Sequence, residues 1–434
     1  MVIIIGAGIN GLAIARQLAK KQHPYCVLEA SDVVGGYIQS ERVEGYGLEY
    51  GPNSLLCDSQ TDAVLDEIGL RADTVPAAEV SKHRFIFKDG KYRKLPSSPP
   101  GLLLGGFFGW RTKWAVLAEM RNRTTGPEDE TLSAFFRRRF SQEIVDYPLN
   151  TFVAGIYAGD PDQLLVRKTF PILREYEREY GSVLRGAMKN KSGERKRSVT
   201  FREGMQQLPR VLAEGLDIRK NTPVSHIEPK RKGFRVILKN GSAMEADQVV
   251  LSVPAFVAAR LLKAEKPDFA AVLEQVDYPP MAVIHSAFPK AAVGVPLNGF
   301  GGLHPQRENL FTAGSIWSSS VFPNKASEGQ VLLTTFVGGA LYRERALLPE
   351  SEIRRRATEE LRRIYQISAP PSFQRFTLWR RAIPQYDAAI LPVHAQAEAE
   401  EKNGLWVGAN WKDGISIADA LKKAPKIAEQ LVSR

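Results

Sequence analysis

Three glycines and one acidic residue near the N-terminus have the types and the spacing that bind a dinucleotide. Gly6, Gly8 and Gly11 form a Gly-x-Gly-x-x-Gly pattern, and Glu29 stands 18 positions beyond Gly11. Gly6 permits a tight turn, Gly8 lets a pyrophosphate approach the backbone, and Gly11 lets a helix pack closely on a strand. The phosphates would meet free N–H groups at a helix start, and Glu29 would accept hydrogen bonds from a ribose. We therefore expect this end of the chain to bind the ADP half of a dinucleotide.

The segments around these residues have the patterns of the elements that must position them. Residues 2–5 are an uninterrupted β-branched run, which predicts a buried parallel strand, and residues 12–20 have helical apolar spacing. A second strand is expected at 25–28, ending at Glu29. A flexible glycine loop is the alternative, and the strand–loop–helix–strand order disfavours it. The glycine doublet at 35–36 allows close passage along an extended cofactor, which favours FAD over NAD.

The C-terminal residues predict a second strand–glycine–helix unit. We expect a strand at 405–408, a loop at 409–414 and an amphipathic helix at 415–431, with Asp413 and Ser416 as capping types near the helix start. A helix N-terminus directed at a flavin pyrimidine would stabilise the negative charge that develops during reduction. Alone, such a unit is only structural. Together with the N-terminal pattern it predicts a flavin site.

Composition excludes several classes of protein. The chain has 434 residues, of which 44% are hydrophobic and 25% charged, so we expect a globular protein of two or three regions rather than disorder, collagen or coiled coil. Two cysteines exclude a disulfide framework, and six scattered histidines give no metal site. The first strand follows Met1 directly, so no leader peptide is expected, and no apolar run is long enough to span a membrane. The net charge of +11 predicts an anionic partner, although no nucleic-acid-binding module accompanies it.

Two basic stretches need an interpretation. Residues 91–123 combine leucines, phenylalanines and tryptophans with seven basic residues and one acid. A helix lying in a membrane interface and a substrate-domain helix with a buried apolar side are both consistent with this pattern. Residues 185–197 are also basic and predict a solvated loop, with RNA or lipid contact as the less favoured alternative.

The glycine-rich segments resemble the amine oxidase and protoporphyrinogen oxidase superfamily, in which FAD is usually held without a covalent bond. The superfamily pattern covers 29–36, Ile38, Ser40, Gly45 and 51–53. Further blocks extend from one terminus to the other and resemble the protoporphyrinogen oxidase family: Asn10, 51–54, 152–161, 335–339, 382–386 and 408–416. Among them, the Ala-Gly-Asp-Pro and Ala-Ile-Pro-Gln-Tyr segments are much more specific than the nucleotide pattern.

The resemblance implies FAD-dependent oxidation of protoporphyrinogen IX to protoporphyrin IX in haem biosynthesis, with oxygen as acceptor and hydrogen peroxide as product. No catalytic side chain and no metal are expected, because the flavin takes the hydride and positioning does most of the work. Oxidation of coproporphyrinogen III is the nearest alternative. An amine oxidase is disfavoured because the family's Gly-Glu pair is replaced by Gly408-Ala409-Asn410. A flavoprotein scaffold or membrane-bound module without turnover is the alternative from a different class.

The resemblance also implies which residues contact each ligand. A propionate would pair with Arg71, while Leu303 and Trp317 would sandwich the ring in an apolar slot, and Val224 would reach the adenine. The competing interpretations are a surface arginine, core residues and a sheet valine. The expected substrate-binding residues are Arg71, Gly155, Leu303 and Trp317. The expected cofactor-binding residues are Gly6, Gly8, Ile9, Asn10, Gly11, Glu29, Ala30, Gly35, Gly36, Gly51, Pro52, Asn53, Val224, Trp379, Gly408, Gly414, Ile415 and Ser416.

We expect an α/β fold, with a Rossmann-like FAD-binding domain, an inserted α+β substrate-binding domain and a helical membrane-associated region. The expected boundaries are 1–90, 201–255 and 376–434 for the FAD-binding domain, 91–200 for the helical region and 256–375 for the substrate-binding domain. The expected location is cytoplasmic, with a peripheral contact on the inner face of the cell membrane. The expected partners are a porphyrinogen and oxygen, without nucleic acid. A homodimer, the physiological electron acceptor and partner enzymes are left open.

Overall fold

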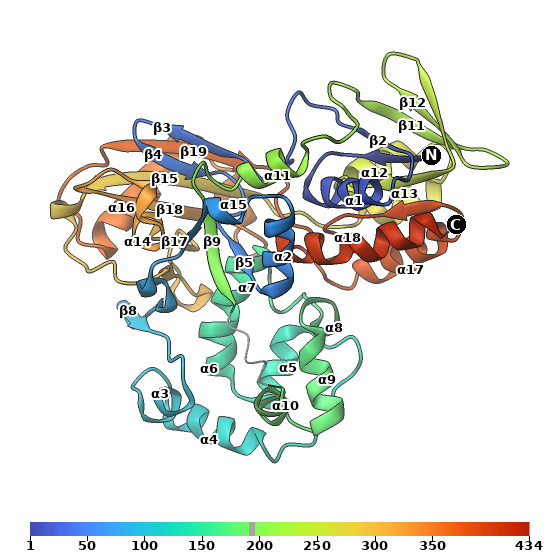
Figure 1. Cartoon of the computed structure of the whole chain (residues 1–434). Helices are drawn as coiled ribbons and strands as arrows, with labels where there is room; N and C mark the ends of the chain where they lie inside the picture. Colours follow the sequence, from blue (N-terminus) through green and yellow to red (C-terminus); the bar gives the residue numbers. More distant parts are fainter. Residues whose placement is uncertain (191–195, 434) are drawn as a thin grey trace.

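The computed structural model describes residues 1–190 and 196–433. Two large β-sheets with their covering helices form the body of the protein, and a group of further helices extends from one side (Figure 1). Both termini lie close together beside the first sheet.

The first sheet is parallel and buried on both faces. Its strands are β1 Val2–Ile5, β2 Tyr25–Leu28, β10 Ile218–Arg219, β14 Gln248–Leu251 and β20 Leu405–Val407. They lie in the order β10-β2-β1-β14-β20, so the predicted N-terminal and C-terminal strands meet in one sheet, joined by β14. The parallel α/β architecture predicted from the sequence is therefore confirmed.

Two separate cores cover the two faces of this sheet. The helices concerned are α1 Ile9–Lys20, α12 Ala255–Leu262, α13 Pro267–Glu274, α17 Ile390–Glu401 and α18 Ile417–Val432. Val2 and Ile4 pack with α1 and α18, while Ile3 and Ile5 pack with α12, α13 and α17. The alternation follows from the strand geometry, in which successive side chains point to opposite faces. A small antiparallel sheet joins the second core; its strands are β11 Val224–Pro229, β12 Phe234–Leu238 and β13 Ala243–Ala246.

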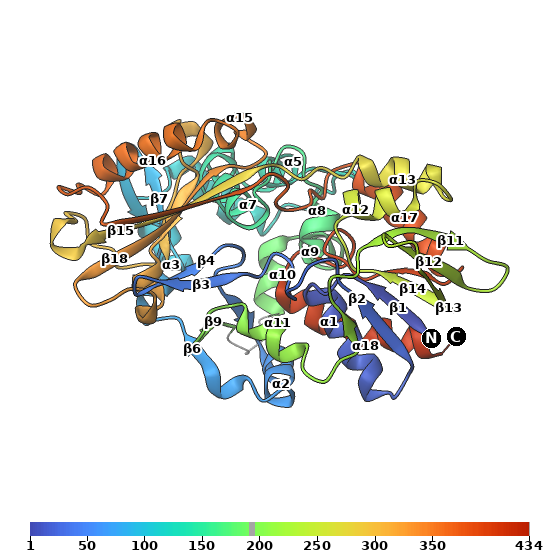
Figure 2. The ribbon, with the colours of Figure 1, turned by 90° about the horizontal axis from the view of Figure 1, so that it is seen from above.

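The second sheet has seven strands. They are β7 Arg84–Lys88, β8 Lys91–Lys94, β15 Met281–Pro289, β16 Gly301–Leu303, β17 Gly314–Ile316, β18 Gln330–Gly338 and β19 Phe373–Trp379. Their order is β19-β15-β18-β17-β16-β7-β8. One face is covered by α16 Glu350–Ile364, which packs Ile353 and Ala357 against Ala282 and Ile284 of β15 (Figure 2). The opposite face of β15 and β18 is free of α16.

The strand pairing differs from the expected boundaries at three places. The hairpin β7–β8 lies in the second sheet because β7 pairs with β16, although 1–90 was expected to belong to the FAD-binding domain. The end of β19, within 376–434, pairs with β15 of the same sheet. Helices α12 and α13, within 256–375, pack on the first sheet.

Short elements connect the two sheets. The strands β3 Ser40–Val43 and β4 Tyr46–Glu49 form one hairpin, and β5 Leu55–Cys57, β6 Thr74–Pro76 and β9 Arg197–Phe201 form a small sheet. Because β5 and β6 both pair with β9, the strand that follows the helical group lies between the segments on either side of α2. The remaining helices of the body are α2 Ser59–Glu67, α11 Gln207–Leu212, α14 Ser318–Val321 and α15 Arg343–Ala346.

The segment expected to be helical, 91–200, does form a group of helices. They are α3 Pro99–Leu104, α4 Trp110–Glu119, α5 Leu132–Arg139, α6 Gln142–Ile144, α7 Asn150–Tyr157, α8 Val166–Thr169, α9 Pro171–Tyr180 and α10 Val183–Lys189, with a π-helical turn at Val145–Leu149. The loop expected at 185–197 is wrong at both ends: 185–189 belongs to α10, and Arg197 begins β9. Residues 191–195 of that stretch lie outside the described residues.

The first two helices of this group carry an exposed apolar surface. Trp110 and Trp114 of α4 are 68% and 65% exposed, and Leu117 and Leu104 are also exposed. Trp110, Trp114 and Leu117 are spaced three or four residues apart, so they share one side of α4. Phe107 and Phe108, by contrast, are buried. The apolar side chains of this segment are therefore partly buried and partly exposed, and the membrane-interface interpretation stays a prediction. Over the described ranges, no helix combines the length and the hydropathy needed to cross a bilayer.

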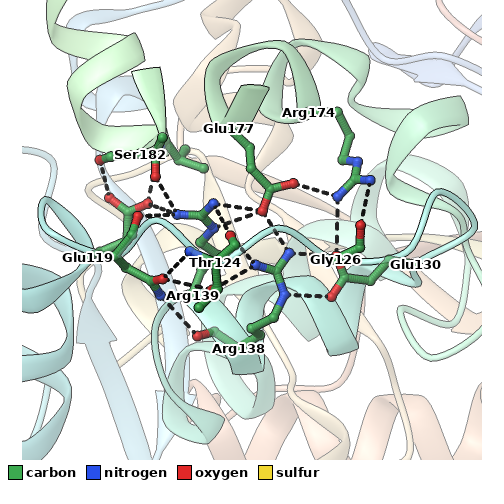
Figure 3. A network of polar contacts seen from close by, with 12 residues as sticks. Glu119, Thr124, Gly126, Glu130, Arg138, Arg139, Arg174, Glu177 and Ser182 are labelled. Carbon is green, nitrogen blue, oxygen red and sulfur yellow. Dashed lines mark hydrogen bonds and ion pairs between the residues drawn. The ribbon is translucent and has the colours of Figure 1, made fainter. Parts of the chain in front are cut away.

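A buried network of charges holds the helical group together (Figure 3). Arg139 of α5 contacts Glu119 of α4 at 3.3 Å and Glu177 of α9 at 2.7 Å, and all three side chains are almost fully buried. Glu177 also contacts Arg138 and Arg174. The amides of Val183 and Leu184 donate to Glu119, which ties α10 to the same cluster.

Candidate functional site

The first glycine loop has the shape needed for a pyrophosphate. Gly6 has a φ of +103°, and a Cβ there would lie 2.6 Å from the carbonyl oxygen of Ser252. A Cβ on Gly11 would lie 2.2 Å from the Gly6 oxygen, whereas a Cβ on Gly8 would meet no atom within 4 Å. Helix α1 starts at Ile9 without a side-chain cap and without an acid in its first turn. The uncapped start of α1 and the open space beside Gly8 therefore suit an anion.

Glu29 lies beside this loop and beside a later segment of the chain. Its Oε2 accepts from the amide of Ala7 at 2.8 Å, and its Oε1 accepts from the amide of Ser31 at 2.9 Å. The amide of Thr222 donates to the Glu29 carbonyl at 2.8 Å. Val224 follows Thr222 by two residues and therefore lies near the Glu29 backbone. A carboxylate can accept further hydrogen bonds beyond these two. Glu29, Ala30 and Val224 thus lie together where the ribose and adenine were expected.

The second glycine segment also lies against this loop. Gly35 and Gly8 form an isolated parallel bridge, and the amide of Gly35 donates to the Ala7 oxygen. Gly36 has a φ of +58°, with only the Gly8 Cα within reach of a Cβ. The two segments therefore form a continuous glycine-lined surface leading away from the start of α1.

The C-terminal loop packs on the same helix. A Cβ on Gly408 would lie 2.3 Å from Cδ1 of Ile14, so the loop passes closer to α1 than any larger residue would permit. Ser416 caps α18 in a capping box with Asp419, as its residue type predicted. The amide of Gly414 donates to the Tyr386 hydroxyl at 3.1 Å, which fixes the turn before the helix. Within the described residues, the amide of Ile415 makes no hydrogen bond and stays available to a ligand.

Asp413 differs from its expected role as a capping residue. Ser416 performs the capping, and Asp413 lies in a largely buried position where burial raises the pKa of its carboxyl to about 6. Its Oδ2 atom has no hydrogen-bond partner among the described residues.

The two sheets meet at the Gly51 segment. The indole N–H of Trp379 donates to the Tyr50 carbonyl at 2.6 Å, and its ring lies 4.9 Å from that of Tyr37. A Cβ on Gly51 would lie 2.0 Å from the Tyr37 oxygen. Asn53 donates to the Gly51 carbonyl. Gly51, Pro52, Asn53 and Trp379 thus stand between the glycine-lined surface and the second sheet, where an isoalloxazine ring would be held.

The face of the second sheet opposite α16 is apolar. Leu303 pairs with Gly314, Gly314 with Phe336, and Ile316 stands two residues beyond Gly314, so Leu303, Ile316 and Phe336 share one face. Gly155 of α7 approaches this face, since a Cβ there would lie 3.8 Å from Cδ2 of Leu303. We call this face, with Gly155, the slot. It suits a flat apolar ring.

Trp317 does not lie in the slot. It is 1% exposed, its ring lies 5.3 Å from Phe85, and its indole N–H donates to Tyr365, the residue that follows α16. The sandwich expected between Leu303 and Trp317 is therefore wrong, because the two side chains occupy opposite faces of the sheet. Ile316, one residue earlier, is the neighbour that faces Leu303. The alternation along β17 was the signal that could have identified it.

Arg71 is committed to other partners. Its guanidinium contacts Asp66 at 3.0 Å and Asp62 at 3.4 Å, both on α2, so two carboxylates already neutralise it. Arg84 was not identified from the sequence, and its position suits a substrate carboxylate better than that of Arg71. It pairs with Gly301, two residues from Leu303, and its guanidinium lies 5.2 Å from the centre of the Phe300 ring.

Arg84 has no acidic partner among the described residues, and partial burial lowers the pKa of its guanidinium. An unpaired cation at the edge of an apolar face is suited to a substrate carboxylate. The signal in the sequence was the alternation in Arg84-Phe85-Ile86, which places the arginine on the same face as Ile86 and Leu303.

Metal chemistry gains no support from the described part of the chain, which holds no cluster of three or more potential ligands. The geometry instead joins a dinucleotide cradle to an apolar slot with a cation at one edge. This arrangement can hold a redox cofactor and present a flat, acid-bearing ring to it.

Comparisons with known proteins agree with this geometry. A family model described as "Flavin containing amine oxidoreductase" matches residues 9–432. The mitochondrial protoporphyrinogen oxidase of Nicotiana tabacum is 30% identical and is aligned over 100% of this chain and 94% of its own length. The protoporphyrinogen oxidase of Bos taurus is 26% identical, with 99% and 98% covered.

Solved structures show the same fold. A structure from Exiguobacterium sp. 255-15 superimposes with a TM-score of 0.82 at 21% identity, covering 100% of this chain and 99% of the other. Cyclohexylamine oxidase from Brevibacterium oxydans IH-35A gives a TM-score of 0.72 at 16% identity, with 100% and 98% covered.

Proposed function

The chain belongs to the flavin containing amine oxidoreductase family, and on that premise we propose that it oxidises protoporphyrinogen IX to protoporphyrin IX. Oxygen is the electron acceptor and hydrogen peroxide the second product. The observation that carries the proposal is the slot: an apolar sheet face that adjoins the dinucleotide cradle and has one unpaired cation, Arg84, at its edge. The full-length similarity to protoporphyrinogen oxidases supports the same reaction.

FAD fits the cradle without a covalent bond. The open space at Gly8, the uncapped start of α1 and the acceptor oxygens of Glu29 suit its ADP half, and Gly408 with Ile415 suits the flavin end. Both cysteines, Cys26 and Cys57, are buried, and neither belongs to the C-terminal loop at 409–414. When bound, FAD supplies the hydride acceptor that the protein lacks.

The side chains of the slot position the substrate rather than exchange protons with it. Leu303, Ile316 and Phe336 would pack against the ring, Gly155 leaves room for it, and Arg84 would bind a propionate. Holding the reacting carbon in one place accounts for most of the rate enhancement in such a site.

The charges on β7 favour protoporphyrinogen over coproporphyrinogen. Lys88 stands on the same face as Arg84, but it is bonded to Glu143 at 2.6 Å and to the carbonyl of Phe107. Only one end of this face therefore offers a free cation. Protoporphyrinogen carries its two propionates at one edge, whereas coproporphyrinogen carries four around the ring. Bound in the slot, coproporphyrinogen would place a carboxylate against apolar side chains, which is unfavourable.

One experiment tests cofactor and reaction together. The purified protein should be yellow, and anaerobic mixing with protoporphyrinogen IX should bleach it and yield fluorescent porphyrin. Arg84→Met should raise KM about ten- to a hundredfold, the cost of one charged hydrogen-bonded contact. Arg71→Met, which removes an arginine already neutralised by Asp62 and Asp66, should leave KM unchanged. A colourless protein, or one that turns over coproporphyrinogen faster, would refute the assignment.

The exposed face of α4 supports a contact with a membrane surface. Its tryptophans would lie at the acyl boundary, and Arg111, Lys113, Arg121 and Arg123 would meet anionic headgroups on the inner face of the cell membrane. The test is sedimentation with vesicles containing anionic lipid at low salt. Protein that stays in the supernatant would exclude this contact. A homodimer remains a prediction of the sequence alone.

A further inference from the structure

A lysine and a glutamate form a buried ion pair next to the slot. Lys325, from the segment between β17 and β18, contacts Glu49 at the end of β4, with a separation of 2.5 Å between Nζ and Oε1. The two side chains are 5% and 2% exposed. Glu49 also accepts from the hydroxyl of Ser40 at 2.5 Å and from the amide of Met205 at 3.0 Å. Glu49 is therefore well satisfied.

Lys325 is not satisfied to the same degree. An ammonium group has three N–H donors, and Glu49 is the acceptor that its Nζ meets within the described residues. Two donors are left for other partners. Leaving buried donors unmet is costly, so water or a ligand is expected to take them.

Lys325 lines two small pockets. The first reaches the slot face, because its lining includes Ile316 and Thr334 together with Asn53. The lining of the second is polar and includes Ser40 and the exposed residues Arg202 and Glu203. Each has room for about one water molecule. The ion pair is thus the polar connection between an apolar slot and the exterior.

The proposed reaction produces a proton inside the slot. Each two-electron step transfers a hydride from the substrate to the cofactor and frees one proton. Over the three steps, two of these protons come from pyrrole nitrogens and one comes from a meso carbon by tautomerisation. A proton released beside apolar side chains needs a path to solvent, because an isolated charge there is costly.

Resting on the proposed function, we infer that the Lys325–Glu49 pair relays this proton out of the slot. Lys325 passes one of its protons to Glu49, and the neutral amine takes the new proton from water in the slot-side pocket. Glu49 then releases its proton through the Ser40 hydroxyl to the outer pocket. One proton enters, one leaves, and no electron moves.

The charged and titratable side chains next to the Lys325–Glu49 pair do not replace it as the proton relay. The Nε2–H of His285 donates to the Glu49 carbonyl at 3.1 Å, and burial lowers the pKa of its imidazole to about 4, so it stays neutral near neutral pH. Arg42 and Arg202 line the outer pocket.

The test separates proton release from flavin bleaching. Wild-type protein is mixed anaerobically with protoporphyrinogen IX in weak buffer containing a pH indicator dye, and both signals are followed in a stopped-flow instrument. In the wild type, dye protonation and bleaching should coincide. In Lys325→Met, dye protonation should lag at least tenfold behind bleaching, and added methylamine should shorten the lag. Ser40→Ala, which keeps the ion pair but removes the outward step, should show a lag as well.

A second buried lysine provides the matched control. Lys88 is also buried and bonded to one glutamate, Glu143, so Lys88→Met removes an equivalent ion pair away from this path. The Lys88→Met variant should be less stable than the wild type, but its dye protonation and flavin bleaching should still coincide. If both signals also coincide in Lys325→Met and Ser40→Ala, the relay does not exist. If wild-type protein fails to bleach, the proposed function fails instead, and the two failures remain distinct.

Discussion

Replacing Arg139 should loosen the helical group far more than its size suggests. The guanidinium donates to Glu177, to Glu119 and to the carbonyl oxygens of Asn122, Thr124 and Gly181. The cluster pairs three arginines with three glutamates, so Arg139→Met leaves one buried negative charge uncompensated (Figure 3). Glu119, which is 0% exposed, would lose its cation altogether. Removing one partner of a buried ion pair typically costs about 3–5 kcal/mol.

Hydrogen exchange measures this cost locally. A chain of this length need not unfold in one step, whereas amide exchange reports the opening of each helix separately. A loss of about 3–5 kcal/mol corresponds to two to four powers of ten in protection of peptides from α5 and α9. Arg137, exposed on the same helix and bonded to Gln142 alone, is the control, and Arg137→Met should change protection by less than about threefold. Equal protection in both variants would show that the network contributes no stability.

Three further outcomes follow from single residues. Trp110→Glu with Trp114→Glu should abolish sedimentation with anionic vesicles at low salt while leaving bound FAD unchanged; vesicle binding that persists would remove α4 from the contact. Glu29→Gln should weaken FAD binding about ten- to a hundredfold in equilibrium dialysis, since hydrogen bonds to a charged group are worth about 1.5–3 kcal/mol, whereas the exposed Asp32→Asn should not. Burial raises the pKa of Asp413 to about 6, so the folded state holds its proton more tightly than the unfolded state; wild-type stability should fall relative to Asp413→Asn as pH rises from about 4 to about 6, and parallel unfolding curves would contradict this.

Local patterns predicted the first sheet well because its elements are continuous in sequence. The run 2–5, the helix at α1 and the strand at 25–28 are each specified by neighbouring residues, and the glycine spacing requires them to be adjacent. The C-terminal strand, β20, was also recognisable as an apolar run. It joins β1 through β14, which pairs with both strands.

The slot was harder to predict because it depends on which face of a strand each residue occupies. Leu303 was identified from its segment, and the structure places it in the slot. Trp317 was assigned to the wrong face. The direction of its side chain depends on where β17 ends, at Ile316, and the ends of strands are poorly predicted from sequence. Arg84 was missed for a related reason, because nothing local in the sequence showed that β7 pairs with β16.

The segment from β4 to Asn53 joins the two halves of the site, and this explains why neither half could be assigned in isolation. Trp379 donates to the Tyr50 carbonyl, His285 contacts the Glu49 carbonyl, and Lys325 pairs with the Glu49 carboxylate. All three partners come from the second sheet, although Gly51 itself packs on Tyr37 beside the glycine-lined surface. A displacement of this segment would therefore move the cofactor cradle and the slot together. Variants here should change FAD affinity and KM in parallel, whereas variants at Leu303 or Ile316 should change KM alone.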